Sequence, residues 1–242
     1  MKSCIHIYRP FKNKMQTDLI YIMELYFEKI EPVFINAEEE ADAYSSELYN
    51  IAMSTPSSGE NDPDPATIAE ACHEAGIEKY EILSLMKYRS LMMWISCMYQ
   101  VWEQQVISFI RGEVKQQNIL HEGTFGDDSH ITSIGKALEC FAFHNYNIKL
   151  MECWDKIEEM RLLVNVIKHA EGYSAEDLRM LRPDFFEWDD SIFFRVEDKL
   201  KYNKSTLLTE TLNVSKDDFF MYYEFLYAFW DELPEVMCSN DL

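Results

Sequence analysis

Apolar residues recur every three or four positions along most of this 242-residue chain, which is the spacing of one face of an α-helix. This pattern predicts helices over 17–54, 66–75, 77–117, 134–145, 147–172 and 215–233. We expect Pro32 to kink or split the first of them, and Gly76 to separate the second from the third. Nearly every position between 91 and 102 is apolar, which is typical of the most enclosed helix of a bundle.

The predicted elements indicate an all-α fold, a bundle of long antiparallel helices with a small aromatic-rich C-terminal extension and room for one short strand pair. We assign residues 1–242 to a single helical domain. Its parts outside the long central helices are an N-terminal arm over 1–14, an exposed Pro-rich loop over 55–65, an irregular extension over 173–214 and the C-terminal helix over 215–233. The extension carries an aromatic-rich cluster, whose members are Phe185, Phe186, Trp188, Ile192, Phe193 and Phe194.

The chain is strongly acidic, with a formal net charge of −21. A protein with this balance does not bind nucleic acid through its overall field, so contact with phosphate would need a local basic patch. The same balance suits a protein that binds a basic partner, such as a toxin or a nuclease. One acidic run, Glu38, Glu39, Glu40 and Asp42, is either a solvated helix face or a docking patch for such a partner.

The cysteine pattern and the absence of long apolar runs predict a reduced, cytoplasmic protein that does not contact a membrane. The six cysteines are scattered without a CxxC pair, and we expect Cys97 to be a buried free thiol. No secretory signal is visible at the N-terminus. The longest strongly apolar run, 91–102, is too short to span a bilayer.

The sequence excludes several common kinds of active site. It contains no GxGxxG, GxxxxGK[ST], GxSxG or HExxH motif, and its seven glycines are few for phosphate-binding loops. Two sets of metal-ligand types occur, in the loop 118–133 and at Cys140 and His144, but neither matches a known metal-binding template. We therefore expect no cofactor and no metal.

The segment 147–172 holds the densest set of chemically useful side chains. Arg161, Asn165 and His169 follow one another at four-residue steps, and Lys168 lies close to the same stripe, so one helix face carries all four. A histidine can move a proton near neutral pH, while arginine and lysine stabilise charge on phosphate and asparagine orients a hydroxyl. These four are our candidate catalytic residues for acid–base chemistry on a phosphodiester.

A purely structural interpretation of the same stripe remains open. Lys168 and His169 would complement the carboxyl end of the helix, before a left-handed cap at Gly172. In this interpretation Arg161 pairs with Glu158, and Asn165 binds a neighbouring backbone group.

The segment RLLVNVIKHAEG, with LYNIAMS and MYQVWEQQVISF as further bundle helices, resembles the HEPN-like superfamily. The resemblance implies an α-helical bundle, commonly a dimer, from a bacterial toxin–antitoxin or phage-defence system. Many such proteins are metal-independent ribonucleases that use an Arg and a His separated by four to six residues, often with a polar residue directly after the Arg. Asn165 and His169 match the polar residue and the histidine, while Arg161 stands with seven residues before His169.

Two functional hypotheses follow. The first is a bacterial defence or toxin–antitoxin type protein, a homodimer, with an RNA-directed site on the helix 148–171; if it is an enzyme, it is a metal-independent ribonuclease. The alternative is an acidic interaction protein, an immunity protein or antitoxin, that neutralises a basic protein partner without catalysis.

Overall fold

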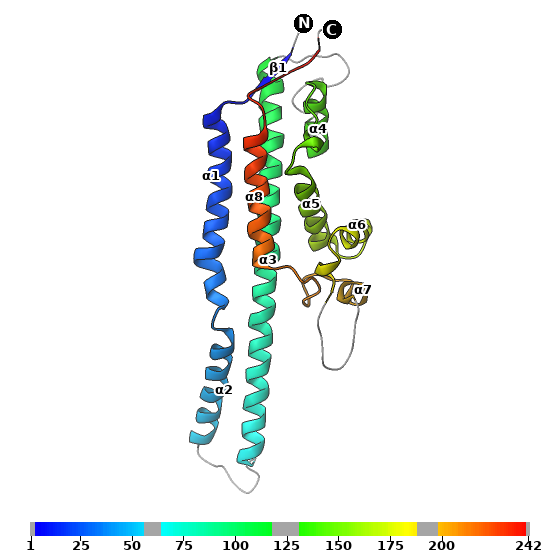
Figure 1. The fold of residues 1–242 in the computed structure, drawn as a ribbon. Helices are drawn as coiled ribbons and strands as arrows, with labels where there is room; N and C mark the ends of the chain where they lie inside the picture. Colours follow the sequence, from blue (N-terminus) through cyan, green and yellow to red (C-terminus); the bar gives the residue numbers. More distant parts are fainter. Residues whose placement is uncertain (1–2, 56–63, 118–130, 188–197, 241–242) are drawn as a thin grey trace. The chain divides into compact units, whose positions relative to one another are not determined.

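The computed structural model describes residues 3–55, 64–117, 131–187 and 198–240, and it confirms the all-α fold class (Figure 1). The chain divides into two compact units. The first comprises Met1–Glu24 and Leu91–Leu242, and the second comprises Leu25–Ser90. Within the described ranges, no helix combines the length and the apolarity needed to cross a bilayer.

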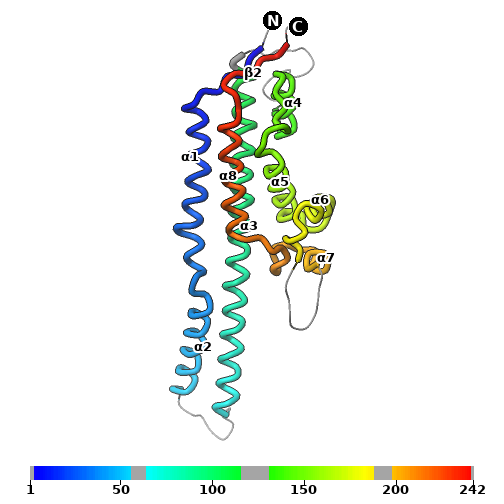
Figure 2. The backbone as a smooth tube through the Cα atoms, viewed as in Figure 1, coloured from blue at the N-terminus to red at the C-terminus, as the bar shows by residue number. Residues whose placement is uncertain are grey.

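The second unit is a helical hairpin. A π-helical turn, Tyr26–Ile30, and a 3-10 turn, Glu31–Phe34, lead into helix α2, Ala37–Ser54. The interruption at Pro32 is therefore confirmed. The return arm is the first half of α3, Pro65–Gln117, a single helix of 53 residues (Figure 2). Of the predicted loop 55–65, residues 56–63 lie outside the described part of the chain.

The predicted break at Gly76 is wrong, because α3 passes through this residue without interruption. A glycine inside a helix costs only about 1 kcal/mol relative to alanine, which the rest of a long helix easily outweighs. Gly76 instead allows α2 to approach: a Cβ atom at this position would lie 2.9 Å from Cβ of Ser45.

The first unit has its core where α1, Arg9–Leu25, and α8, Lys216–Glu232, lie along the second half of α3 (Figure 1). The ring centroids of Phe11 and Phe109 are 5.1 Å apart, and those of Trp102 and Phe229 are also 5.1 Å apart. The enclosed stretch 91–102 is largely buried, as predicted. Cys97 is an exception, since it is exposed and not the buried thiol that we expected.

The two ends of the described chain are joined, which corrects two expectations. Strand β1, Cys4–His6, pairs antiparallel with β2, Val236–Cys238, and a disulfide links Cys4 to Cys238. Of the predicted loose arm 1–14, the described residues 3–14 are thus ordered, since α1 already begins at Arg9. The expectation of a fully reduced protein is also wrong. Pairing between positions 234 residues apart leaves no periodic signal in the sequence.

The remaining elements of the first unit are short. They are α4, Ile134–Phe143, a 3-10 turn, Ile148–Leu150, helix α5, Trp154–His169, helix α6, Tyr173–Leu181, a 3-10 turn, Pro183–Phe185, and α7, Lys199–Asn203. The extension 173–214 is therefore more helical than predicted. Phe185 and Phe186 are buried, while the other members of the predicted aromatic cluster lie in 188–197, outside the described residues. The C-terminal helix is confirmed, with a capping box formed by Ser215 and Asp218.

Candidate functional site

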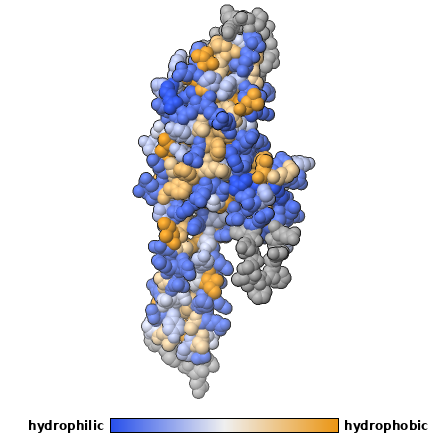
Figure 3. Space-filling view, in the orientation of Figure 1, coloured by the Kyte–Doolittle hydropathy of each residue, from blue (hydrophilic) through white to orange (hydrophobic). Residues whose placement is uncertain are grey.

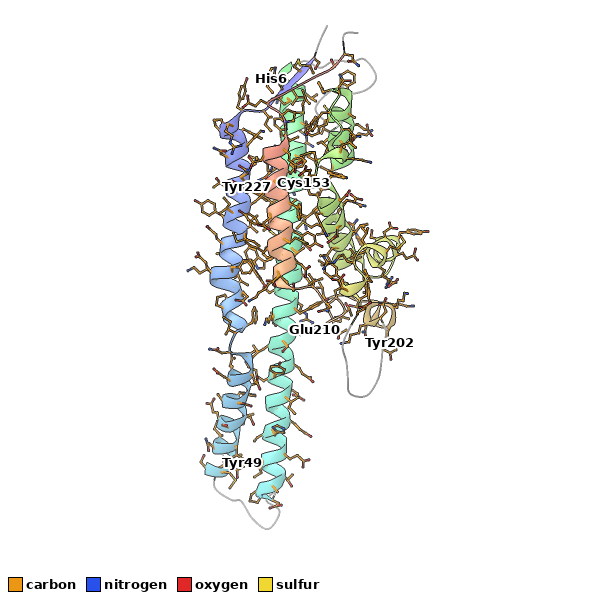
Figure 4. The ribbon with its side chains drawn as sticks, viewed as in Figure 1. His6, Tyr49, Cys153, Tyr202, Glu210 and Tyr227 are labelled. Carbon is orange, nitrogen blue, oxygen red and sulfur yellow. A yellow bond between two sulfur atoms is a disulfide. The ribbon has the colours of Figure 1, made fainter. Side chains whose placement is uncertain are left out.

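Helix α5 carries the candidate residues and is held at its amino end by α8. The carboxylate of Glu232 accepts hydrogen bonds from the backbone N–H groups of Glu152, at 2.9 Å, and of Cys153, at 3.2 Å. Cys153, directly before α5, is labelled in Figure 4. A carboxylate at this position satisfies free donors and is favoured by the helix dipole. The apolar side of α5 is buried along its whole length, so the helix has little freedom to rotate.

The four candidate residues are the ones that α5 leaves accessible in its second half. Between 161 and 169 the buried residues are Leu162, Leu163, Val164, Val166 and Ile167. Arg161 and Asn165 are half-buried, and Lys168 and His169 are exposed. The helix thus presents these four polar side chains, and no other residue of this stretch, to a ligand.

Arg161 is occupied by an acidic neighbour. Its Nε and Nη2 atoms donate to the two carboxylate oxygens of Glu158, at 2.9 Å and 2.5 Å. This bidentate hydrogen bonding raises the pKa of Arg161 above its usual value, although partial burial acts in the opposite direction. The pair is about one-third exposed on both sides. A phosphate at Arg161 would therefore have to compete with Glu158.

Lys168 and His169 occupy the last turn of α5, where positive charge is favoured. The helix ends at Ala170, which adopts a positive φ of 58° and donates its N–H to the Val166 carbonyl oxygen at 2.8 Å. The predicted left-handed cap at Gly172 is wrong, because this glycine is extended and precedes α6. The side chain of Asn165 makes no hydrogen bond with another described residue, so it does not bind a neighbouring backbone group there.

A buried ionic network that the sequence pattern did not predict lies beside the candidate stripe. Glu159 on α5 is only 5 % exposed, and its carboxylate pairs with Arg182 at 2.9 Å and with Lys156 at 2.7 Å. Arg182 also pairs with Asp184 at 2.7 Å and with Asp218 at 2.8 Å. This network ties α5 to the end of α6 and to the first turn of α8.

A second arginine in the same region clamps the connection after α5. Arg179 on α6 donates to Glu171 at 2.6 and 2.8 Å, and to Asp198 at 2.6 Å. The hydrogen bonds that Arg179 donates to the Glu171 carboxylate raise the pKa of Arg179. In both clusters every basic group is paired with acidic groups, so we interpret the clusters as structural. Their only sequence signal is that Glu159 falls on the apolar face of α5, where a charge needs a partner.

The suggested metal ligands do not assemble into a site in the part of the chain described here. His144 is buried, its Nδ1 donates to the Cys140 carbonyl oxygen at 2.7 Å, and its Nε2 lies 3.0 Å from Oγ of Ser3. Among the described residues, no group of three or more His, Cys, Asp or Glu side chains could hold a metal ion. The residues 118–130 of the predicted loop lie outside the described ranges.

Comparison with known proteins adds no relative. No family model matches the chain, and no curated protein or solved structure is significantly similar to it. The functional argument therefore depends on the geometry of the residues themselves.

Proposed function

We propose that this chain is a bacterial defence or toxin–antitoxin type protein with an RNA-directed site on α5. One observation carries the proposal: Arg161, Asn165, Lys168 and His169 are the accessible residues on the second half of α5, where the other residues are buried. These are the residue types that phosphodiester chemistry needs, and they stand on a helix that is fixed at both ends.

Each residue has a role in this proposal. His169 is the general acid or base, because its imidazole is exposed and can both donate and accept a proton. Lys168 and Arg161 bind the phosphate, and Arg161 exchanges its bond to Glu158 for one to the substrate. Asn165 orients a ribose hydroxyl through an amide that no other described residue engages. The activity would be that of a metal-independent ribonuclease.

The test is RNA cleavage by the purified protein with EDTA present, which removes contaminating metal-dependent nucleases. The His169→Ala variant is compared with His73→Ala, a matched control at another exposed histidine. We expect the parent and the control to cleave and the His169→Ala variant to be inactive. Absence of cleavage by the parent, or equal cleavage by all three proteins, would overturn the proposal. Light scattering on the same samples tests the homodimer that the resemblance implies.

A further variant separates a phosphate-binding arginine from a structural one. Glu158→Gln removes the charge that holds Arg161, so we expect tighter RNA binding, by about three- to tenfold. The same change removes no contact with RNA, because Glu158 does not bind the phosphate in this proposal. Unchanged or weaker binding would show that Arg161 does not act on RNA.

A second candidate function is an acidic interaction protein that binds a basic partner. It is favoured by the exposure of Glu38, Glu39, Glu40 and Asp42 on α2, in the hairpin unit. This function would leave His169 without a role. Binding of a basic partner that is unchanged in His169→Ala would therefore support it, and loss of that binding would contradict it.

A further inference from the structure

The helical hairpin of the second unit exposes many large apolar side chains. Eight of them are at least 45 % exposed on its two helices and the turn before them: Val33, Ile35, Ile51, Met53, Ile77, Tyr80, Ile82 and Met86. Few of its described residues are buried, and the hydrophobic ones are Tyr26, Ala41, Cys72 and Tyr88. A hairpin with so little core of its own has apolar surface available for a partner. Figure 3 shows such residues scattered among hydrophilic ones on the face that it draws.

A cleft lies between the two helices of this hairpin. It has a volume of about 280 Å³, and α2 contributes Glu38, Asp42 and Ser45 to its lining while α3 contributes Gly76, Ile77 and Tyr80. Gly76 and Ser45 meet at its floor, since a Cβ atom on Gly76 would touch Ser45. A cleft of this volume falls below the usual size of a small-molecule site and suits one inserted side chain.

The two walls of the cleft differ in chemistry. Glu38 and Asp42 stand four residues apart on α2, so both carboxylates lie on the same side of that helix. On α3, Ile77 and Tyr80 stand three residues apart and are each nearly half exposed. An ion pair between Lys79 and Glu40, at 3.0 Å, joins the helices beside the cleft. The cleft therefore offers anionic groups opposite an aliphatic and an aromatic surface.

An arginine side chain fits this combination. Its guanidinium group pairs with carboxylates and stacks on a tyrosine ring, and its stem covers aliphatic surface. A second copy of this chain is disfavoured as the occupant, because the hairpin carries many more acidic than basic residues and two copies would repel each other.

We propose that the hairpin is the docking surface for a basic amphipathic helix of another protein, which inserts an arginine into the cleft between Glu38, Asp42, Ile77 and Tyr80. The apolar side of that helix covers exposed residues of α2 and α3 around the cleft. This inference rests on the second candidate function and names the surface and the class of partner.

The experiment uses the full chain and a fluorescent synthetic helix of leucine and arginine, about 20 residues long, followed by anisotropy. The double variant Glu38→Gln/Asp42→Asn is compared with Glu39→Gln/Glu47→Gln, which removes the same charge from α2 outside the cleft. A second pair compares Tyr80→Ala with Tyr44→Ala, an exposed tyrosine of α2 that does not line the cleft. Circular dichroism verifies that all variants remain helical.

We expect the cleft double variant to bind the arginine helix about tenfold more weakly than the parent, and the matched double variant to lose no more than about twofold. Tyr80→Ala weakens binding, and Tyr44→Ala does not. An equal loss of affinity in the two double variants would overturn the proposal that the arginine enters the cleft, but it would leave the second candidate function standing. No binding of the arginine helix by the parent would overturn both.

Discussion

The Tyr222 hydroxyl donates a hydrogen bond to Oε1 of Glu159, at 2.9 Å, in the interior of the first unit. This bond joins α8 to α5, and the same carboxylate is held by Arg182 and Lys156. Burial, with Glu159 nearby, raises the pKa of Tyr222, so the phenol stays protonated and remains a donor. The position of the candidate stripe on α5 thus depends on an ionic network that the stripe itself does not include.

Tyr222→Phe removes this donor and leaves the ring in place. Because the buried carboxylate keeps its two cationic partners, we expect the free energy of unfolding to fall by about 1–2 kcal/mol. Tyr223→Phe is the matched control, since Tyr223 is only partly buried and contacts aromatic neighbours that phenylalanine keeps. Urea unfolding measures both variants. Equal losses in the two variants would contradict a specific contribution of the hydrogen bond between Tyr222 and Glu159.

His144 should make stability depend on pH. Burial lowers the pKa of its imidazole from 6.5 in the folded protein, although the hydrogen bond to the Cys140 carbonyl oxygen opposes this. At pH values between this lowered pKa and 6.5, His144 is protonated to a greater extent in the unfolded chain than in the folded protein. The contribution of His144 is therefore complete above about pH 6.5 and is lost as the pH falls through this window.

Urea unfolding at several pH values between about 5 and 7.5 measures this dependence. We expect the parent to lose stability toward the acid end, and the His144→Gln variant to lose less over the same range. The acids Asp184 and Asp198 do not interfere, because arginine neighbours lower their pKa values from 3.8, below this window. Parallel pH profiles of the two proteins would contradict the assignment.

The sequence could predict the helices because the apolar spacing and the capping residues that indicate a helix lie within a few turns of one another. The apolar spacing of α8 and its Ser215 cap are local features, and so is the interruption at Pro32. The predicted break at Gly76 was wrong for a physical reason. One glycine lowers the stability of a long helix only slightly, and here it allows a close approach of Ser45, which lies on another helix.

The contacts of the candidate site depend on longer distances. Helical spacing alone placed Arg161, Asn165 and His169 on one face, and the pairing of Arg161 with Glu158 is a local i, i+3 contact. The ionic network was not visible, because Glu159 finds Arg182 23 residues away and Tyr222 63 residues away. The position of Glu159 on the apolar face of α5 indicates that its charge needs a partner, but the local sequence does not identify that partner.

The disulfide between Cys4 and Cys238 should stabilise the first unit. It ties together chain ends 234 residues apart, and a cross-link over so long a loop restricts the unfolded chain strongly. We expect reduction, or the Cys4→Ser variant, to lower the free energy of unfolding by about 2–4 kcal/mol. Cys97→Ser is the control, since Cys97 is an exposed free thiol and its loss should change stability little.

Alkylation of the native protein tests the same assignment chemically. Mass spectrometry should find Cys97 modified first at about pH 8, and Cys4 and Cys238 modified only after reduction. Burial raises the pKa values of Cys140 and Cys153 to about 12, so both remain unreactive thiols. Alkylation of Cys4 without a reductant would show that the disulfide is absent.

The two glycines of α3 should respond in opposite ways to alanine. At Gly112 an added Cβ atom meets nothing within 4 Å, so Gly112→Ala should stabilise the helix by up to about 1 kcal/mol. At Gly76 the same atom meets Ser45 at 2.9 Å, so the helices of the hairpin must separate or shift. We expect Gly76→Ala to destabilise the hairpin by about 1–2 kcal/mol, after the gain in helix propensity is included.

Hydrogen exchange in α2 and in the first half of α3 measures the hairpin separately from the first unit. Exchange should be faster in Gly76→Ala and unchanged there in Gly112→Ala. The change Ser45→Gly removes the Cβ atom that Gly76→Ala meets but lowers the helix propensity of α2, so the double variant is compared with Ser45→Gly alone. If close packing is the cause, adding Gly76→Ala to Ser45→Gly should not speed exchange further. Faster exchange in the double variant than in Ser45→Gly alone would mean that Gly76 is needed for another reason.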